Sequence, residues 1–411
     1  MNFFTKLKKV ILEKRLIKTL KKKIYPYLIG FLLLFRFSNT NIKIYTSKLK
    51  KIDTKDLPLA NRIFKSYKLI KSEQDAKSIV YKPSSLWQSQ IDNDFSFLVE
   101  AYKNDDVEKF LFFLQNFGNW EKYLGVENQD LINKYNKNIF LKKFLSNEIF
   151  GGQFELWKFF NKNEDLDDLD IPKHGNQIGA VIDNKFVVIG SFLNHIYSKI
   201  LSNYLNQKGE SNKILEIGGG YGKLAYYLLK NISNYTYIDL DIPETLTLAS
   251  YFLSKSFPNK RNLFYGETRF NSDIINDYDL IFLPPWEIEN IQDNSLNLAI
   301  NKNSLGEMSP ETARNYINHI HRISKYFFSM NHEYFRNNFD DGKKSLINKE
   351  YNIEKKFKEL IRYPDLGHLT YERNKIDFDN NIFFYIYEKK IINDEKIDLE
   401  KSGLCNVSGM K

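Results

Sequence analysis

The stretch Ile214-Leu215-Glu216-Ile217-Gly218-Gly219-Gly220-Tyr221-Gly222-Lys223-Leu224 decides the fold class. It begins as a short, mostly apolar strand, breaks into a glycine turn and continues as an amphipathic run to Leu229. Strand, glycine turn and helix in this order form the ligand crevice of an open α/β sheet. Glycines accept positive φ and let a ligand come close to the backbone. We therefore expect a binding site at this turn, with a tight β-to-α turn that binds nothing as the alternative.

The spacing of the glycines separates two kinds of nucleotide site. A dinucleotide fingerprint reads G-x-G-x-x-G, and its third glycine would fall at Lys223. The pattern present is an acid followed by a glycine-rich turn, formed by Glu216, Gly218, Gly219, Gly220 and Gly222. It resembles the first motif of the class I S-adenosylmethionine (SAM) methyltransferases. That resemblance implies SAM as the cofactor, and Glu216 could accept a hydrogen bond from its ammonium group, directly or through water.

A second acidic position follows the next predicted strand, residues 235–240. Asp241 ends this strand with Pro243 and stands 25 positions after Glu216. An acid at such a strand end can accept hydrogen bonds from both ribose hydroxyls of an adenosyl ligand. Asp239 competes for this role, and we favour Asp241. The combination of the glycine turn with a later Asp-x-Pro resembles small-molecule O-methyltransferases in particular.

Strands and helices alternate along the second half of the chain, so the sheet should be mainly parallel and doubly wound, with a Rossmann-like α/β fold. We expect this domain over residues 176–390, after a mostly helical domain over 41–175 in which Asn104 to Asp106 separates two helices and Gly151-Gly152 breaks a third. Residues 262–270 should be a turn-rich connection. Residues 1–40 form a basic, partly apolar segment, and 391–411 a charged tail.

Several polar or aromatic residues fall at the carboxyl ends of predicted strands, where ligands bind in such sheets. Trp286 follows Leu283-Pro284-Pro285, and either Trp286 or Glu287 could border the adenine, although a structural tryptophan is equally compatible. Methyltransferases that act on amino groups need Asp or Asn where this chain has Leu283, which argues against a nucleic-acid substrate. The other candidates, assigned to substrate binding, are Asn303, Ser304 and Asn331.

Methyl transfer to a hydroxyl is helped by a general base, because a neutral hydroxyl is a poor nucleophile. His332, at the end of a predicted strand, is our first candidate, since an imidazole titrates near neutral pH. Glu307 is the second, either as the base or as a hydrogen-bond acceptor for a substrate hydroxyl. His368 lies on a loop that could reach the pocket. No ligand spacing specifies a metal, and a single cysteine, Cys405, excludes a zinc site built on cysteines.

The charge of the chain is concentrated at its beginning. The formal net charge is +9, of which residues 1–23 carry +8, so the rest of the chain is close to neutral and shows no basic nucleic-acid footprint. Residues 1–36 could lie on an anionic membrane surface, or could pack an apolar face against the body or a partner. One cysteine fits a reducing compartment, so we expect a cytoplasmic protein with peripheral membrane contact as an option.

The motifs together resemble the sugar O-methyltransferase family of bacterial surface-polysaccharide gene clusters. The matching stretches are 216–222, 241–244, 301–308 and 329–331, within a resemblance that covers roughly residues 80–390. It implies methyl transfer from SAM to a sugar hydroxyl of a surface polysaccharide or its precursor. The alternatives are a methyltransferase for another small molecule or for nucleic acid, an NAD-dependent Rossmann enzyme, and a non-catalytic scaffold. The oligomeric state is not indicated by the sequence.

Overall fold

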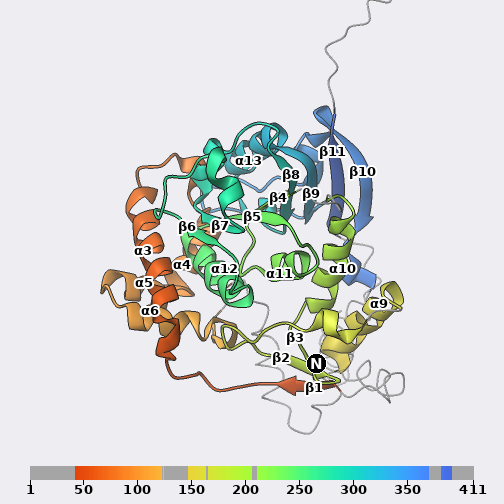
Figure 1. Cartoon of the computed structure of the whole chain (residues 1–411). Coiled ribbons are helices and arrows are strands. Elements are labelled where there is room, and N and C mark those ends of the chain that lie inside the picture. Colours follow the sequence, from red (N-terminus) through yellow and green to blue (C-terminus); the bar gives the residue numbers. More distant parts are fainter. Residues whose placement is uncertain are drawn as a thin grey trace, which may run out of the picture.

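The computed structural model describes residues 42–122, 124, 147–162, 165–205, 211–369 and 381–390 (Figure 1). The predicted basic segment 1–40, the tail 391–411, Cys405 and the side chain of His368 lie outside the described part. None of the helices within the described ranges combines the length and apolar character needed to span a bilayer.

An eight-stranded sheet forms the centre of the molecule, in the order β10-β11-β9-β8-β4-β5-β7-β6. Six neighbouring strands are parallel, and β11 runs antiparallel to both of its neighbours. Helices α10 to α13 flank the sheet (Figure 1), so the predicted doubly wound, mainly parallel fold is confirmed. The strands are β4 (Asn212–Ile217), β5 (Tyr235–Leu240), β6 (Asn262–Phe264), β7 (Leu280–Leu283), β8 (Leu296–Lys302), β9 (Ser324–His332), β10 (Phe357–Pro364) and β11 (Ile382–Lys389).

The order in which the chain adds strands to the sheet changes sides at β4, which is the topological switch point. From β4 it moves outward through β5 to β7 and β6, and it then returns to the other side of β4 to add β8 and β9. All residues of β5 and β7 are buried, as expected for strands covered on both faces. A crevice forms where the carboxyl ends of strands diverge at such a switch point, so this topology places the ligand site after β4. The flanking helices are α10 (Ser191–Ser202), α11 (Lys223–Lys230), α12 (Pro243–Ser256) and α13 (Pro310–Ile323).

The N-terminal region is mostly helical, as predicted. Asp106 caps the N-terminus of α6 by accepting from the Lys109 N–H, which explains why the polar residues 104–106 separate two helices. A small sheet pairs β1 (Ile42–Tyr45) with β2 (Gly179–Ile182), and β2 with β3 (Lys185–Val187). One hydrophobic core continues through both regions. The helices are α3 (Leu57–Gln74), α4 (Ser85–Asn93), α5 (Ser96–Lys103), α6 (Val107–Leu114) and α9 (Gly152–Phe160).

Of two predictions about local structure, one was wrong and the other was incomplete. Gly151-Gly152 does not break a helix, because a π-helical turn (Asn147–Gly151) runs directly into α9. The 262–270 connection contains β6, which adds a parallel edge strand beside β7. In both places tertiary packing outweighs the local preference of glycine and polar residues for turns.

A buried carboxylate joins the helical region to the sheet domain. The Asp56 Oδ2 atom accepts from the Tyr251 hydroxyl at 2.6 Å and from the Gln115 amide at 3.0 Å, and Oδ1 pairs with the Lys255 ammonium. Burial alone would raise the pKa of Asp56, but the hydrogen bonds from Lys255, Tyr251 and Gln115 outweigh it and hold this pKa below its usual value. The ionised form therefore stabilises the contact between η1 (Thr54–Asp56) and α12.

The substitution D56N should destabilise the protein by about 2 kcal/mol at pH 7, because it weakens hydrogen bonds to a charged group. A carboxyl group with a lowered pKa contributes stability above its unfolded-state pKa and loses it as the pH falls through the folded-state value. The difference from wild type in urea unfolding should therefore shrink at pH 3. The matched control is D105N, which removes the exposed Asp105–Lys68 ion pair and should change stability by less than about 0.5 kcal/mol. Equal effects of the two substitutions would contradict this assignment.

Candidate functional site

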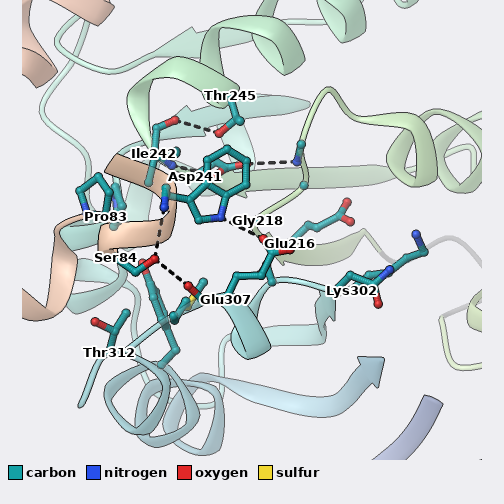
Figure 2. A pocket seen from close by; sticks show the side chains of 18 of the residues that line it. Pro83, Ser84, Glu216, Gly218, Asp241, Ile242, Thr245, Lys302, Glu307 and Thr312 are labelled. Atoms are coloured by element: carbon teal, nitrogen blue, oxygen red, sulfur yellow. Dashed lines mark hydrogen bonds between the residues drawn. The ribbon is translucent and has the colours of Figure 1, made fainter. Parts of the chain in front are cut away.

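A pocket opens at the carboxyl ends of β4, β5 and β8, where the topology predicts it (Figure 2). Its floor is the glycine turn after β4, and one wall follows β8 and continues into α13. An adjoining wall comes from residues 81–87 of the helical region, so segments far apart in the sequence meet here. The lining residues are Tyr81, Lys82, Pro83, Ser84, Trp87, Asn194, Glu216, Gly218, Gly219, Gly220, Tyr221, Lys223, Leu224, Asp241, Ile242, Thr245, Pro285, Lys302, Asn303, Ser304, Glu307, Met308, Thr312 and Tyr316.

The glycine turn needs glycine for two different reasons. Gly218 has a φ of +74°, and a Cβ atom there would lie 2.4 Å from the Ser304 Oγ, so a side chain would collide with the loop after β8. Gly220 has a φ of +62°, but a Cβ atom there would meet nothing within 4 Å. The backbone at Gly220 therefore faces open space in the pocket. Gly222, which is outside the pocket lining, precedes α11 as its N-cap with a φ of +89°.

Asp241 is fixed against this turn. Its Oδ2 accepts from the Gly220 N–H at 3.0 Å, and its Oδ1 accepts from the Ile242 N–H at 2.7 Å. Burial raises the pKa of Asp241 to about 6, although hydrogen bonds from Thr245 and the two backbone groups lower it. Asp239 is fully buried behind the turn, where burial raises its pKa well above the usual range. Of the two competing acids, Asp241 is therefore the one that lines the pocket.

Glu216 lies at the deep end of the pocket and is only 2% exposed. Its Oε2 accepts from the Tyr237 hydroxyl at 2.7 Å. Burial raises the pKa of Glu216 to about 7, whereas the Tyr237 hydrogen bond and the positive charge of Lys302 act in the opposite direction. A cation beside Glu216 would favour its ionised form, so this carboxyl group is suited to a positively charged ligand.

The wall that follows β8 carries Glu307, at the end of η9 (Leu305–Glu307). Its Oε2 accepts from the Trp87 indole N–H at 2.9 Å, and its backbone carbonyl accepts from the Ser84 hydroxyl at 2.8 Å (Figure 2). Burial raises the pKa of Glu307 to about 7. The side chain therefore changes charge near neutral pH while lining the pocket, as a general base must.

Asn303 and Ser304 also line the pocket, in the loop that leads to Glu307. Asn303 adopts a φ of +59°, and its N–H donates to the Met330 carbonyl at 2.7 Å. The Ser304 hydroxyl donates to the Ile217 carbonyl at 3.1 Å, which ties the loop to the end of β4. The two strand ends on either side of the switch point are thus held in a fixed relation.

Besides Gly222, three of the residues predicted for the site lie outside its lining: Trp286, Asn331 and His332. Trp286 packs on Tyr265, with the Lys77 ammonium 4.9 Å from the centre of its ring. Asn331 is buried, donates to the Asn301 Oδ1 at 3.0 Å and accepts from the Gly306 N–H at 3.3 Å. The structure places Asn331 as a support of the loop that carries Glu307.

His332 also lies behind that loop. Its Nδ1 is 2.8 Å from the Asn381 amide nitrogen, and its ring lies so close to Gly306 that a Cβ atom there would be 2.9 Å from the His332 Cδ2. Burial lowers the pKa of His332. Its assignment as the base stays a prediction, but Glu307 is the candidate that reaches the pocket.

Sequence reasoning missed residues 81–87, which belong to the helical region. The local signal, Pro83 followed by Ser84, marks the N-terminus of α4, where Ser84 is the N-cap. Nothing in this signal indicates a contact with Glu307, which is more than 200 positions away.

No group of three or more His, Cys, Asp or Glu side chains is placed to hold a metal ion in the ranges that the structure covers.

No family model matches the sequence, and no curated protein matches it either. Among solved structures, the mitomycin 7-O-methyltransferase MmcR is 11% identical, with a TM-score of 0.31, and the match covers 49% of this chain and 55% of MmcR. A SAM-dependent methyltransferase from Aquifex aeolicus is 11% identical, with a TM-score of 0.32 and coverage of 49% and 93%.

A third solved structure is the N-methyltransferase NodS from Bradyrhizobium japonicum, in complex with S-adenosylhomocysteine (SAH). It is 8% identical, with a TM-score of 0.32, and the match covers 48% of this chain and 88% of NodS. Likenesses at these identities and TM-scores assign neither a family nor a substrate to this chain. The mostly parallel sheet with flanking helices is a Rossmann-like α/β fold.

Proposed function

We propose that this protein is a SAM-dependent methyltransferase. The observation that carries the proposal is the pair of carboxyl groups, Glu216 and Asp241, at the ends of adjacent strands on either side of a glycine turn whose backbone faces the pocket. SAM carries a positive charge on its ammonium and sulfonium groups and two ribose hydroxyls. Glu216 would hold the ammonium, Asp241 would accept from the ribose, and Gly220 would leave room for the ligand.

The charge around the glycine turn distinguishes this ligand from a dinucleotide. Glu216 and Asp241 flank the turn, and the Asp241 Oδ2 already accepts from the Gly220 N–H that a phosphate would use. A pyrophosphate brought to this position would meet negative charges at short range, which is unfavourable in a poorly solvated site. Lys223 donates to the Ile189 carbonyl at 2.6 Å. The residues therefore fit a cationic adenosyl ligand better than NAD.

The chemistry that we propose is transfer of the methyl group to a hydroxyl oxygen. When bound, SAM supplies a methyl group activated by its sulfonium, and SAH leaves as the C–S bond breaks and the C–O bond forms. Glu307 would take the hydroxyl proton, because it lines the pocket and has a pKa of about 7. The walls of the pocket would hold the acceptor in line with the methyl group, which is the main requirement for this displacement.

For the acceptor, we propose a sugar hydroxyl of a surface polysaccharide or its precursor. Support comes from the sequence motifs and from polar side chains in the pocket lining, among them Lys82, Asn303 and Thr312. The near-neutral charge of residues 24–411 weighs against a nucleic acid. A cytoplasmic location, with membrane contact through residues 1–36, would suit a lipid-linked acceptor and remains part of this proposal.

Calorimetry with SAM, SAH and NAD tests the cofactor. We expect SAM and SAH to bind at pH 7.5 and NAD to give no binding heat. The substitution G220V should abolish SAM binding, because its side chain would enter the pocket. G342V is the matched control: Gly342 has a φ of +79° with nothing within 4 Å of a Cβ atom, so both variants carry similar backbone strain, but Gly342 does not line the pocket. Binding of NAD in place of SAM, or equal loss in both variants, would refute the proposal.

A further inference from the structure

We infer that Trp87 is a positioning residue for Glu307 and that residues 81–87, here called the acceptor wall, form the half of the pocket that receives the methyl acceptor. This inference rests on the proposed function and extends it to the side of the site that the sequence motifs leave open. The acceptor class that it implies is a hydroxyl compound that packs against the indole of Trp87 while its hydroxyl reaches Glu307.

The first support is the pair of contacts that the acceptor wall makes with one residue. Trp87 binds the Glu307 side chain through its indole N–H, and Ser84 binds the Glu307 backbone carbonyl. Within the described residues, the Glu307 carboxyl group accepts side-chain hydrogen bonds on Oε2 only, from Trp87. Its Oε1 is therefore left for the proton of an acceptor hydroxyl, and the direction of the carboxyl group is set from the helical region.

The second support is that the acceptor wall is anchored along its length. At one end the Tyr81 hydroxyl donates to Glu289 at 2.6 Å, and Tyr81 is buried with only 4% exposure. Further along the wall, the Ser85 hydroxyl accepts from the Asp340 backbone N–H at 3.0 Å. Ser84 is also the N-cap of α4, where its hydroxyl accepts a hydrogen bond from the backbone N–H of Trp87. A wall fixed in this way can hold the Trp87 indole in one place when a ligand binds.

The third support is chemical. The indole is a hydrogen-bond donor only, so it stabilises the ionised form of Glu307, which is the form that accepts a proton. Burial and the negative charge of Asp241 on the facing strand end act against that form. Glu216, Lys82 and Lys302 line the same pocket and contribute to its potential. Trp87 is therefore placed to keep a buried carboxyl group usable as a base.

The test uses the indole N–H signal of Trp87 in the full-length protein labelled with ¹⁵N-tryptophan. The chain has four tryptophans, so W87F identifies the signal by its disappearance. We expect the Trp87 signal to move downfield as the pH rises from 5 to 9, with a midpoint near 7, because a hydrogen bond to a carboxylate is stronger than one to a neutral carboxyl group. E307Q should abolish this titration, and D241N should lower its midpoint.

Binding of SAM to the same variants separates the acceptor side from the cofactor side. W87F should bind SAM within about twofold of wild type, and so should the control W120F, which changes a tryptophan packed on Phe97 and Phe113. A Trp87 signal that does not titrate, or that still titrates in E307Q, would overturn the inference, as would a loss of SAM affinity above about tenfold in W87F. If wild type bound no SAM while Trp87 still titrated with Glu307, the proposed function would fail and the pairing would stand.

Discussion

The substitution D241N should weaken SAM binding about 100-fold and leave the fold intact. Asn keeps an oxygen that can accept from the Gly220 N–H, so the glycine turn should hold its shape. It cannot accept from two ribose hydroxyls at once, and it has no charge to strengthen those bonds. The loss of one charge-assisted hydrogen bond and the weakening of another correspond to about 2.7 kcal/mol, or two powers of ten in Kd. Isothermal calorimetry with SAM and SAH measures this directly.

D239N is the matched control for this prediction. Asp239 lies two residues earlier, within β5, and is fully buried, where burial raises its pKa well above the usual range. Asp239 does not line the pocket, so its replacement by Asn should remove no contact with a ligand. We expect SAM affinity within about twofold of wild type. A large loss in D239N with little change in D241N would assign the ribose contact to Asp239 instead.

The substitution E216Q should change stability and SAM affinity in opposite directions. The pKa of Glu216 is about 7 in the folded protein and about 4.5 when unfolded. A group with a raised pKa contributes its stability below the unfolded-state pKa, and this stability is lost as the pH rises through the folded-state value. A difference of about 2.5 pKa units corresponds to about 3 kcal/mol. At pH 8.5, E216Q should therefore be more stable than wild type by about 2 to 3 kcal/mol, whereas the two should be similar near pH 4.

SAM should bind E216Q at least tenfold more weakly at pH 8.5, because the ammonium group loses its charged partner. In wild type, binding should tighten as the pH rises from 5 to 8, since Glu216 and Asp241 must ionise, with pKa values of about 7 and about 6. In E216Q only the Asp241 step should remain. Urea unfolding and calorimetry across this pH range measure both effects. A variant that is less stable than wild type at pH 8.5 would show that the Glu216 carboxylate is not strained in the free protein.

Most of the sheet could be predicted from the sequence, because buried parallel strands are short apolar runs between turn residues. β10 was not predicted. Its sequence, Phe357-Lys358-Glu359-Leu360-Ile361-Arg362-Tyr363-Pro364, is rich in charge, and most of the strand is exposed. It is an edge strand that depends on pairing with β11 rather than on burial. Edge strands of this kind show only a weak hydrophobic pattern in their own sequence. They are identified by the strand with which they pair, which for β10 is β11.

The candidate site likewise contains one part that the sequence predicts and one part that it does not. The glycine turn, Glu216 and Asp241 are local motifs, and the structure brings them together in one pocket. Residues 303, 304 and 307 also reach it, because strand ends on either side of the switch point converge. Trp87 could not have been predicted, since its role depends on the packing of α4 beside the loop after β8. An aromatic residue in an amphipathic helix is normally interpreted as part of the core.

The pairing of β1 with β2 has a consequence for synthesis of the chain. Ile42 pairs with Ile182, 140 positions later. At a translation rate of about 5–20 residues per second, β1 is therefore synthesised roughly 7–28 s before the strand with which it pairs. Ser84 waits longer, because Glu307 follows it by 223 positions. During that interval the helical region has neither its sheet partner nor the loop against which α4 packs. A chaperone that binds nascent chains would find its target in this first part of the polypeptide, and premature termination before β8 would leave these helices without the loop that they pack against.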